Sequence, residues 1–330
     1  KLSMHFKREK LEKFRSFNGP LIDVRSPSEY YKGHLPNSIN IPLFDNDERE
    51  IVGKIYKKEG KEKAVLQGLQ FFEKKLELLL DNLFINIHTN KSILKTNNNE
   101  LPIRIYCARG GMRSESIAWL LEKYNFYPIT LKGGYKTYRR WILDSFSKKW
   151  NIIVIGGKTG TGKTRLLSFL DKNKYQTIDL EGYASHRGST FGGLGMKEQP
   201  SNEQFENRIS EKLNTFNTNK NIFIEAESAN IGKCKIPHEF FNQMKKSRRI
   251  EIVRSEENRL YELIETYSVF KKSELKESVL RIKKRLGPQR TKMALDGIND
   301  EKWELVCRSV WIIMIDVMNL KKLVKKTLRH

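Results

Sequence analysis

A cysteine in a glycine-bearing loop is the first residue of this sequence placed to do chemistry. Cys107 follows an expected strand over 103–106 and begins the segment CARGGMRS, which leads into an expected helix over 113–124. Backbone N–H groups in such a turn converge on one point, where the helix N-terminus adds partial positive charge. This field and the two arginines favour a thiolate, which can attack an anionic or sulfur-bearing substrate. Cys107 is therefore the predicted catalytic residue, and the anion-binding loop around it consists of Arg109, Gly110, Gly111, Arg113 and Ser114.

The second chemical segment is a phosphate-binding loop. The letters GKTGTGKT at 157–164 follow an expected strand over 152–155 and open an expected helix over 163–170, which is the context that the motif requires. Glycines let backbone N–H groups wrap an anion, the lysine reaches phosphate oxygens, and the threonine can ligate Mg²⁺. The predicted phosphate-binding residues are Gly157, Gly160, Gly162, Lys163 and Thr164.

Two acidic segments follow expected strands in the same half of the chain. Hydrolysis at a phosphate loop needs an acid that holds Mg²⁺, and the run IFIEAE at 222–227 could supply it. The stretch 179–192 joins acids and a His–Arg pair at the carboxyl end of a strand, where α/β proteins bind ligands. The further substrate-site candidates are Asp179, Glu181, His186, Arg187, Ser189, Glu225 and Glu227. No resident metal site is assigned, and Mg²⁺ stays open as a cofactor of the phosphate loop.

The elements that position these segments alternate between strands and helices. Further strands are expected at 21–24, 129–131, 176–180, 222–226 and 250–253, and helices at 64–83, 135–146 and, as long charged helices, 256–286. This alternation favours parallel sheets with helices on both faces. The stretch 82–100, rich in Asn, Lys and Thr, is expected to be a surface insertion. We predict two α/β domains, 1–147 with the cysteine loop and 148–330 with the phosphate loop and a basic helical C-terminal part.

Composition limits the class of protein. The 330 residues carry 62 Lys and Arg against 39 Asp and Glu, a net charge of +23, and 38% are hydrophobic. The hydrophobic content excludes a disordered chain, and the charge favours a polyanionic partner, nucleic acid before an anionic membrane surface. Three cysteines are too few for a disulfide framework, and no stretch approaches the ~18 apolar residues of a membrane span. We therefore expect a cytoplasmic protein with no membrane partner.

The first half resembles rhodanese-like domains. The letters DVRSPSEY at 23–30 and GHLPNSINIP at 33–42 are similar to the opening of that family, and GGY at 133–135 to the glycine pair before its last helix. In that family the loop cysteine carries a persulfide. The resemblance implies a rhodanese-like three-layer fold, whereas the Cys-x5-Arg spacing of the loop taken alone leaves a cysteine-dependent phosphatase open.

The two halves together resemble the tRNA 2-selenouridine synthase family. Besides the cysteine loop, the similar motifs are GGYK at 133–136, DLEG at 179–182, HRGS at 186–189, QPS at 199–201, FENR at 205–208, EAES at 225–228, IG at 231–232, and LG and QR at 286–290. The resemblance implies a transferase acting on wobble 2-thiouridine in tRNA. The family is understood to geranylate the sulfur with geranyl diphosphate and then to replace the geranylthio group with selenium from selenophosphate.

Carried onto this sequence, the resemblance makes Cys107 the selenium-handling residue. The loop at 157–164 would bind the diphosphate of the prenyl donor, whose departure needs the charge of Lys163. No tightly bound cofactor is implied, and an enzyme that makes selenophosphate is a candidate partner. The sequence departs from the family at Ala108, where a Trp is usual, so the packing of the substrate is expected to differ.

Two other functions remain open. One is a rhodanese-type sulfurtransferase regulated by nucleotide binding to the second domain. The other is a non-catalytic RNA-binding protein, against which the intact Cys107, Lys163 and Thr164 argue. The candidate tRNA contacts, which could equally be solvated helix faces, are Arg281, Lys283, Lys284, Arg285, Arg290 and Lys292, and Lys321, Lys322, Lys325, Lys326 and Arg329. Cys234 and Cys307 lie outside any glycine loop and are expected to be structural.

Overall fold

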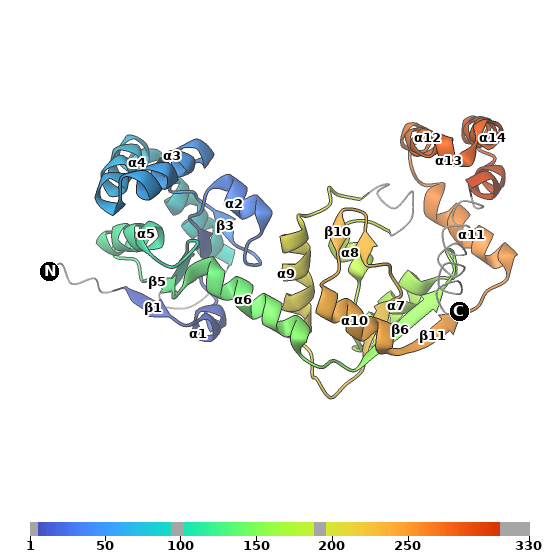
Figure 1. The fold of residues 1–330 in the computed structure, drawn as a ribbon, viewed down its shortest axis with the longest axis horizontal. Helices are drawn as coiled ribbons and strands as arrows, with labels where there is room; N and C mark the ends of the chain where they lie inside the picture. The colour runs from blue at the N-terminus through green and yellow to red at the C-terminus, as the bar shows by residue number, and fades with distance from the viewer. Residues whose placement is uncertain (1–5, 94–101, 188–195, 311–330) are drawn as a thin grey trace. The chain divides into compact units, whose positions relative to one another are not determined.

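The chain folds into two compact units, Lys1–Ser145 and Phe146–His330. The computed structural model describes residues 6–93, 102–187 and 196–310. Ser189 and the basic cluster from Lys321 to Arg329 lie outside these described residues. Each unit has a parallel sheet with helices packed on it, which confirms the predicted α/β class (Figure 1).

The first unit is built on a five-stranded parallel sheet. The strands are β1 (Lys7–Glu9), β2 (Leu21–Asp23), β3 (Ile39–Asn40), β4 (Ile103–Tyr106) and β5 (Pro128–Leu131), in the order β1-β5-β4-β2-β3. Residues 21–23 and 128–131 are buried throughout, as apolar strands covered on both faces must be. Since β4 pairs with β2 and β5, the loop after Tyr106 leaves the middle of the sheet.

Helices cover both faces of this sheet. They are α1 (Leu11–Ser16), α2 (Pro27–Lys32), α3 (Asn46–Lys58), α4 (Lys61–Ile93), α5 (Met112–Lys123) and α6 (Gly134–Ser147). Figure 1 shows α3, α4 and α5 on one side and α1 and α6 on the other. This is the three-layer arrangement expected of the first half.

The interpretation of residues 82–100 as a surface insertion was wrong for the part that the structure describes. Helix α4 continues to Ile93, and Leu79, Leu83 and Ile87 lie buried in the core of the first unit. Their spacing of four places them on one face of the helix. The polar residues of the stretch, such as Asn82 and Asn86, hide this repeat from a reading based on composition.

The second unit contains a four-stranded parallel sheet and a short hairpin. The sheet order is β11 (Arg248–Ile252), β6 (Ile152–Gly157), β8 (Ile222–Glu225) and β7 (Gln176–Ile178). The hairpin pairs β9 (Asn230–Ile231) with β10 (Cys234–Lys235). The accompanying helices are α7 (Lys163–Lys172), α8 (Leu180–Ala184), α9 (Asn202–Leu213), α10 (His238–Lys246) and α11 (Glu256–Tyr267).

A small helical subdomain follows α11. It consists of α12 (Lys272–Arg281), α13 (Lys283–Leu286) and α14 (Pro288–Asn299), packed around Leu275, Val279, Ala294 and Ile298. The prediction of long helices over 256–286 was therefore wrong. Helix α11 ends at Tyr267, and α12 ends just before Ile282. These interruptions let several short helices pack around one apolar core.

Two further sequence expectations can be placed on this fold. Cys234 is buried in β10, and Cys307 packs against Leu260 and Leu263 of α11, so both occupy packing positions. Among the described helices, none combines the length and the apolar character needed to cross a membrane.

Candidate functional site

The thiol of Cys107 lies in a cradle of donors at the end of β4. Its residue is only 3% exposed, and its Sγ accepts the Gly111 N–H at 3.4 Å and the Ser114 hydroxyl at 3.2 Å. Both donors come from the turn that starts α5, where the helix dipole places partial positive charge. The loop geometry predicted for Cys107, Gly111 and Ser114 is therefore present, and it suits a sulfur that carries negative charge.

The glycine pair Gly133–Gly134, which follows β5, lets the chain pack against the backbone of the cysteine loop. The Tyr135 N–H donates to the Cys107 carbonyl at 2.9 Å, and the Lys136 N–H donates to the Ala108 carbonyl at 3.0 Å. Gly134 has φ +58, and a Cβ there would lie 2.3 Å from the Cys107 carbonyl oxygen. Gly110 is also left-handed, with φ +64. Only glycine lets the two loops approach this closely.

We expect Gly134→Ala to destabilise the first unit by about 3 kcal/mol, because it adds both a left-handed Ala and an overpacked contact. Gly111→Ala is the matched control in the same loop, since its φ is −125 and a Cβ there would meet nothing within 4 Å. The control should change stability by less than about 0.5 kcal/mol. Urea unfolding of the two variants measures the difference, and equal stabilities would contradict the close approach of the loops.

The two arginines of the cysteine loop differ in their surroundings. The Arg113 guanidinium makes two hydrogen bonds with Glu29 of α2, at 2.7 and 3.2 Å. Burial alone would raise the pKa of Glu29, but the hydrogen bonds and charge of Arg113 lower it to about 2. Arg113 therefore ties α5 to α2, a contact that the sequence did not predict. Arg109 is exposed and has no hydrogen bond or ion pair among the described residues, so its charge remains available to an anion.

Asp23 and Arg25 form a buried ion pair at the end of β2. Arg25 is 3% exposed, binds Asp23 through Nη2 at 2.6 Å, and lies 3.8 Å from the centre of the Tyr135 ring. Because Tyr135 directly follows the glycine pair, this contact braces the back of the cysteine loop. Asp23 and Arg25 belong to the rhodanese-like motif at 23–30, but the motif does not predict their contact with Tyr135.

The phosphate loop lies between β6 and α7. Gly160 and Gly162 have φ +80 and +82, so the backbone turns its N–H groups inward. The Lys163 ammonium donates to the Gly157 carbonyl at 3.2 Å and lies at the mouth of the loop. The strand, loop and helix predicted around Gly157, Gly160, Gly162, Lys163 and Thr164 are all in place.

A buried arginine that the sequence analysis missed supports this loop. Arg259 of α11 is 5% exposed, and its Nε donates to the Thr159 carbonyl at 2.9 Å. A Cβ on Gly160 would lie 2.6 Å from the Arg259 carbonyl, so α11 packs directly on the loop. Arg259 is separated from Thr159 by 100 residues, and no local signal could have linked them.

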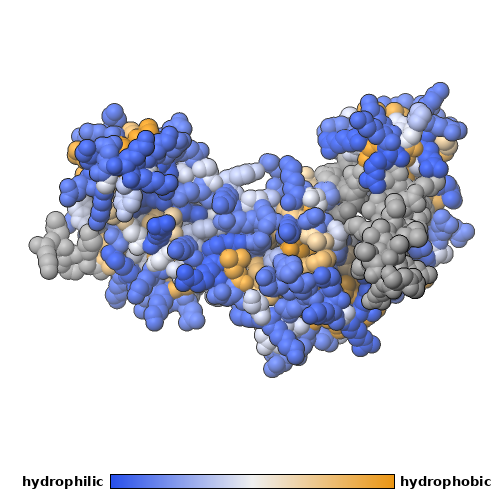
Figure 2. All heavy atoms as spheres, in the orientation of Figure 1, coloured by the Kyte–Doolittle hydropathy of each residue, from blue (hydrophilic) through white to orange (hydrophobic). Residues whose placement is uncertain are grey.

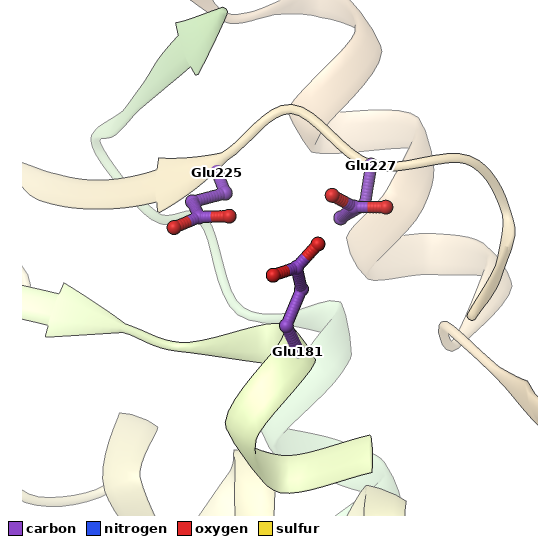
Figure 3. A group of neighbouring side chains, drawn as sticks. All are labelled: Glu181, Glu225 and Glu227. Carbon is purple, nitrogen blue, oxygen red and sulfur yellow. The ribbon is translucent and has the colours of Figure 1, made fainter. Parts of the chain in front are cut away.

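Three glutamates gather beside Lys163. Glu225 ends β8, Glu227 follows two residues later, and Glu181 comes from the first turn of α8. Figure 3 shows their carboxylates facing a common space, and one oxygen from each lies within 4.8 Å of the others. Glu225 is 1% exposed, and among the described residues neither of its carboxylate oxygens has a hydrogen-bond partner. A buried carboxylate without a partner must take up a proton or bind a cation.

The electrostatics of the three glutamates agree with this conclusion. Burial raises the pKa of Glu225 to about 7, helped by the charges of Asp179 and Glu227 and opposed by Thr164 and Lys163. Burial and the charges of Glu225 and Glu227 also raise the pKa of Glu181, and Lys163 again opposes the shift. Three carboxylate oxygens around one point are a donor set that fits a hard divalent cation such as Mg²⁺.

The other predicted residues of this region have different positions. Asp179 caps α8 by accepting the Gly182 N–H at 2.8 Å, so its carboxylate is engaged by the backbone. His186 is half-buried, which lowers its pKa. The Arg187 guanidinium lies 5.4 Å from the centre of the Phe270 ring. Of the two acids that the sequence proposed in 179–192, the structure brings Glu181 to the cluster.

Gln199 fixes the position of α8 and was missed as a site residue. Its side-chain amide donates to the carbonyls of Ala184 and Ile231 at 3.1 and 3.0 Å and accepts the Lys233 N–H at 2.9 Å. It therefore joins the end of α8 to the β9–β10 hairpin. Because Glu181 is carried by α8, Gln199 is a positioning residue for the cluster of glutamates.

Comparisons with known proteins cover both units. Residues 7–140 match the family model of the rhodanese-like domain, and residues 150–301 match the model described as tRNA 2-selenouridine synthase AAA domain. One solved structure, the N-terminal domain of a putative ATP/GTP binding protein from Clostridium difficile 630, is 38% identical, with a TM-score of 0.35 over 42% of this chain and 99% of that one.

Several curated relatives are called tRNA 2-selenouridine synthase. The protein from Nitrosomonas europaea is 35% identical over 75% of this chain, and this chain spans 63% of its length. The proteins from Hydrogenovibrio crunogenus and Sulfurovum sp. are each 33% identical over 319 residues, which is 81% and 82% of their lengths. With a third of the positions identical over most of both chains, this chain belongs to the tRNA 2-selenouridine synthase family.

Proposed function

We propose that this protein converts wobble 2-thiouridine in tRNA to 2-selenouridine. The observation that carries the proposal is the presence, in a member of this family, of both an intact thiol cradle and an intact phosphate loop. Cys107 has its two donors, and Lys163 sits at the mouth of a glycine cradle. A non-catalytic RNA-binding protein would have no need to keep either arrangement.

We propose two successive steps, each assigned to one loop. In the first, the sulfur of 2-thiouridine displaces diphosphate from geranyl diphosphate, and the phosphate loop holds the diphosphate as it leaves. In the second, selenophosphate and water replace the geranylthio group, which leaves as geranylthiol, while selenium stays on the nucleoside and phosphate is released. We place selenium handling at Cys107, whose surrounding N–H and O–H donors favour an anionic ligand.

In the first step, the residues of the second unit have separable roles. Lys163 and the loop N–H groups neutralise the charge that develops on the leaving diphosphate. Glu181, Glu225 and Glu227 would hold Mg²⁺ with Thr164, and the ion would add positive charge beside the same oxygens. Arg259 keeps the loop in shape through the Thr159 carbonyl.

The experiment that tests the proposal is incubation with 2-thiouridine tRNA, geranyl diphosphate and selenophosphate, followed by nucleoside mass spectrometry. The expected products are first S-geranyl-2-thiouridine and then 2-selenouridine. An unchanged 2-thiouridine peak, with sulfur transferred from thiosulfate to cyanide by the same preparation, would instead favour the rhodanese-type sulfurtransferase.

The cluster of glutamates also predicts a pH-dependent response to Mg²⁺. The pKa of Glu225 is raised from 4.5 to about 7 in the folded protein. The free energy of unfolding of the metal-free protein is therefore highest, as far as this group is concerned, below pH 4.5, and it falls as the pH rises through about 7. A cation that binds the ionised carboxylates should restore it. We therefore expect the rise in melting temperature on adding Mg²⁺ to be larger at pH 8.5 than at pH 5.5.

Glu225→Gln should remove most of the rise in melting temperature that Mg²⁺ causes. It should also reduce the loss of stability that the metal-free protein shows as the pH rises. Glu239→Gln, on the exposed surface of α10, is the control that changes the net charge equally. Differential scanning calorimetry at the two pH values measures both responses. A Mg²⁺ effect of the same size in Glu225→Gln would show that the ion binds elsewhere.

A further inference from the structure

The helical subdomain carries a dense group of cations with no acid among them. Residues 283–292 contain five Lys or Arg residues and no Asp or Glu. They lie on α13 and on the first turns of α14, and all five are exposed. The group consists of Lys283, Lys284, Arg285, Arg290 and Lys292.

These five cations have no ionic partner among the described residues, whereas several cations near them do. Lys272, Arg281, Lys302 and Arg308 each pair with an acid, at 2.7, 2.6, 3.0 and 2.8 Å. Within the described parts of the chain, none of the five makes a side-chain hydrogen bond or an ion pair. An unpaired group of like charges costs stability, so its positive potential is available to an anionic ligand.

The fold places these five cations on the outside of the helical subdomain. Leu286, Ala294 and Ile298 are buried in the core of the subdomain, and Gly287, with φ +81, turns the chain sharply between α13 and α14. The turn brings the lysines of α13 beside the first turns of α14. Figure 2 shows mainly hydrophilic side chains over these helices on the face that it draws.

A hollow lies between the two helices. Its volume is about 390 Å³, and it is lined by Lys283, Lys284, Pro288, Thr291, Lys292, Leu295 and Asp296. Pro288 and Leu295 form an apolar part of the wall, and three ammonium groups belong to the same lining. We call these seven residues the basic hollow.

We propose that the basic hollow binds an unpaired nucleotide segment of the tRNA. The lysines would contact phosphates, and the apolar wall would receive a base or ribose, which is how proteins hold single-stranded RNA. Asp296 supplies an acceptor for a base N–H. This inference rests on the proposed function only in taking tRNA as the substrate, and it concerns binding alone.

An anionic membrane fits the basic hollow less well. Membrane-surface helices present a row of large apolar side chains outward to enter the lipid, whereas on α13 and α14 only Met293 is such an exposed side chain, and Pro288 and Leu295 line the hollow. Asp296 in the lining would also repel a uniformly anionic surface. The concave shape and mixed lining favour RNA.

The test compares two triple variants that change charge equally. Lys283→Glu/Lys284→Glu/Lys292→Glu alters the hollow, and Lys57→Glu/Lys58→Glu/Lys61→Glu alters exposed lysines at the turn between α3 and α4. Binding of unmodified tRNA transcript to the full chain is followed by fluorescence anisotropy at several salt concentrations. We expect the hollow variant to lose at least tenfold in affinity and the slope of log affinity against log salt to fall by about 2.

The control variant should lose less than threefold in affinity. A second hollow variant with Gln at the three positions keeps the test valid if the Glu variant unfolds, and circular dichroism checks the fold of each. Equal losses in both triple variants, or none in the hollow variants, would overturn the inference and leave the proposed function intact. If the hollow variants lose binding to phosphatidylglycerol vesicles but still bind tRNA, the hollow binds a membrane. If the unaltered protein does not bind tRNA, both proposals are wrong.

Discussion

Cys107→Ser is expected to reduce selenium incorporation into tRNA by at least about 10³-fold, because it removes the group to which we assign selenium handling. The sulfur is buried between the Gly111 N–H and the Ser114 hydroxyl, and a serine hydroxyl there is a far weaker nucleophile than a thiol. When geranyl diphosphate is supplied, S-geranyl-2-thiouridine should accumulate, since the first step does not use this residue. Nucleoside mass spectrometry follows both products.

Cys307→Ala is the control for this variant. Cys307 lies against α11, outside both loops, so its replacement should leave selenium incorporation within about twofold of the unaltered protein. Binding of tRNA should be the same in all three proteins. Undiminished selenium incorporation by Cys107→Ser would remove this residue from the chemistry.

Lys163→Ala is expected to slow formation of S-geranyl-2-thiouridine by about 10²- to 10³-fold, the usual cost of losing one group that stabilises developing charge. Its ammonium lies at the mouth of the glycine cradle, 3.2 Å from the Gly157 carbonyl, where a leaving diphosphate would need it. When tRNA that already carries the S-geranyl group is supplied, Lys163→Ala should convert it to 2-selenouridine at a nearly normal rate. This recovery distinguishes a local effect on the first step from general misfolding.

Lys158→Ala is the matched control, since Lys158 is an exposed lysine of the same loop that lies outside the positions that the motif requires. It should keep at least about a third of the geranylation rate. If Lys163→Ala geranylates normally, or fails equally on tRNA that is already geranylated, the assignment of the prenyl diphosphate to this loop is wrong.

Much of both loops could be predicted because their information is local. The Cys107 loop and the segment 157–164 are contiguous, and each depends on glycines whose conformational freedom is a property of the residue type. The alternation of strands and helices likewise indicated parallel sheets, and the resemblance to the family held over most of the chain. Residues 82–93 were misjudged because the buried face of α4 is made by Leu83 and Ile87 within a polar composition.

The partners of these loops could not be predicted, because they depend on contacts between distant segments. Arg259 reaches the phosphate loop across 100 residues, and Arg113 binds Glu29 across 84. Glu181 joins Glu225 and Glu227 because the parallel strands β7 and β8 pair and end at the same edge of the sheet, where α8 begins. The spacing of these residues along the chain does not encode this pairing.

The amino-acid order alone therefore specified which residues could act, a thiol and an anion cradle, since backbone conformation and side-chain chemistry are set within a few residues. The folded chain decided which charges remain available to ligands. Arg113 is neutralised by Glu29, whereas the lysines of the basic hollow have no ionic partner within the described residues. The buried oxygens of Glu225 likewise lack a hydrogen-bond partner there. Electrostatic energy depends on distance and burial, and both exist only once the segments have packed together.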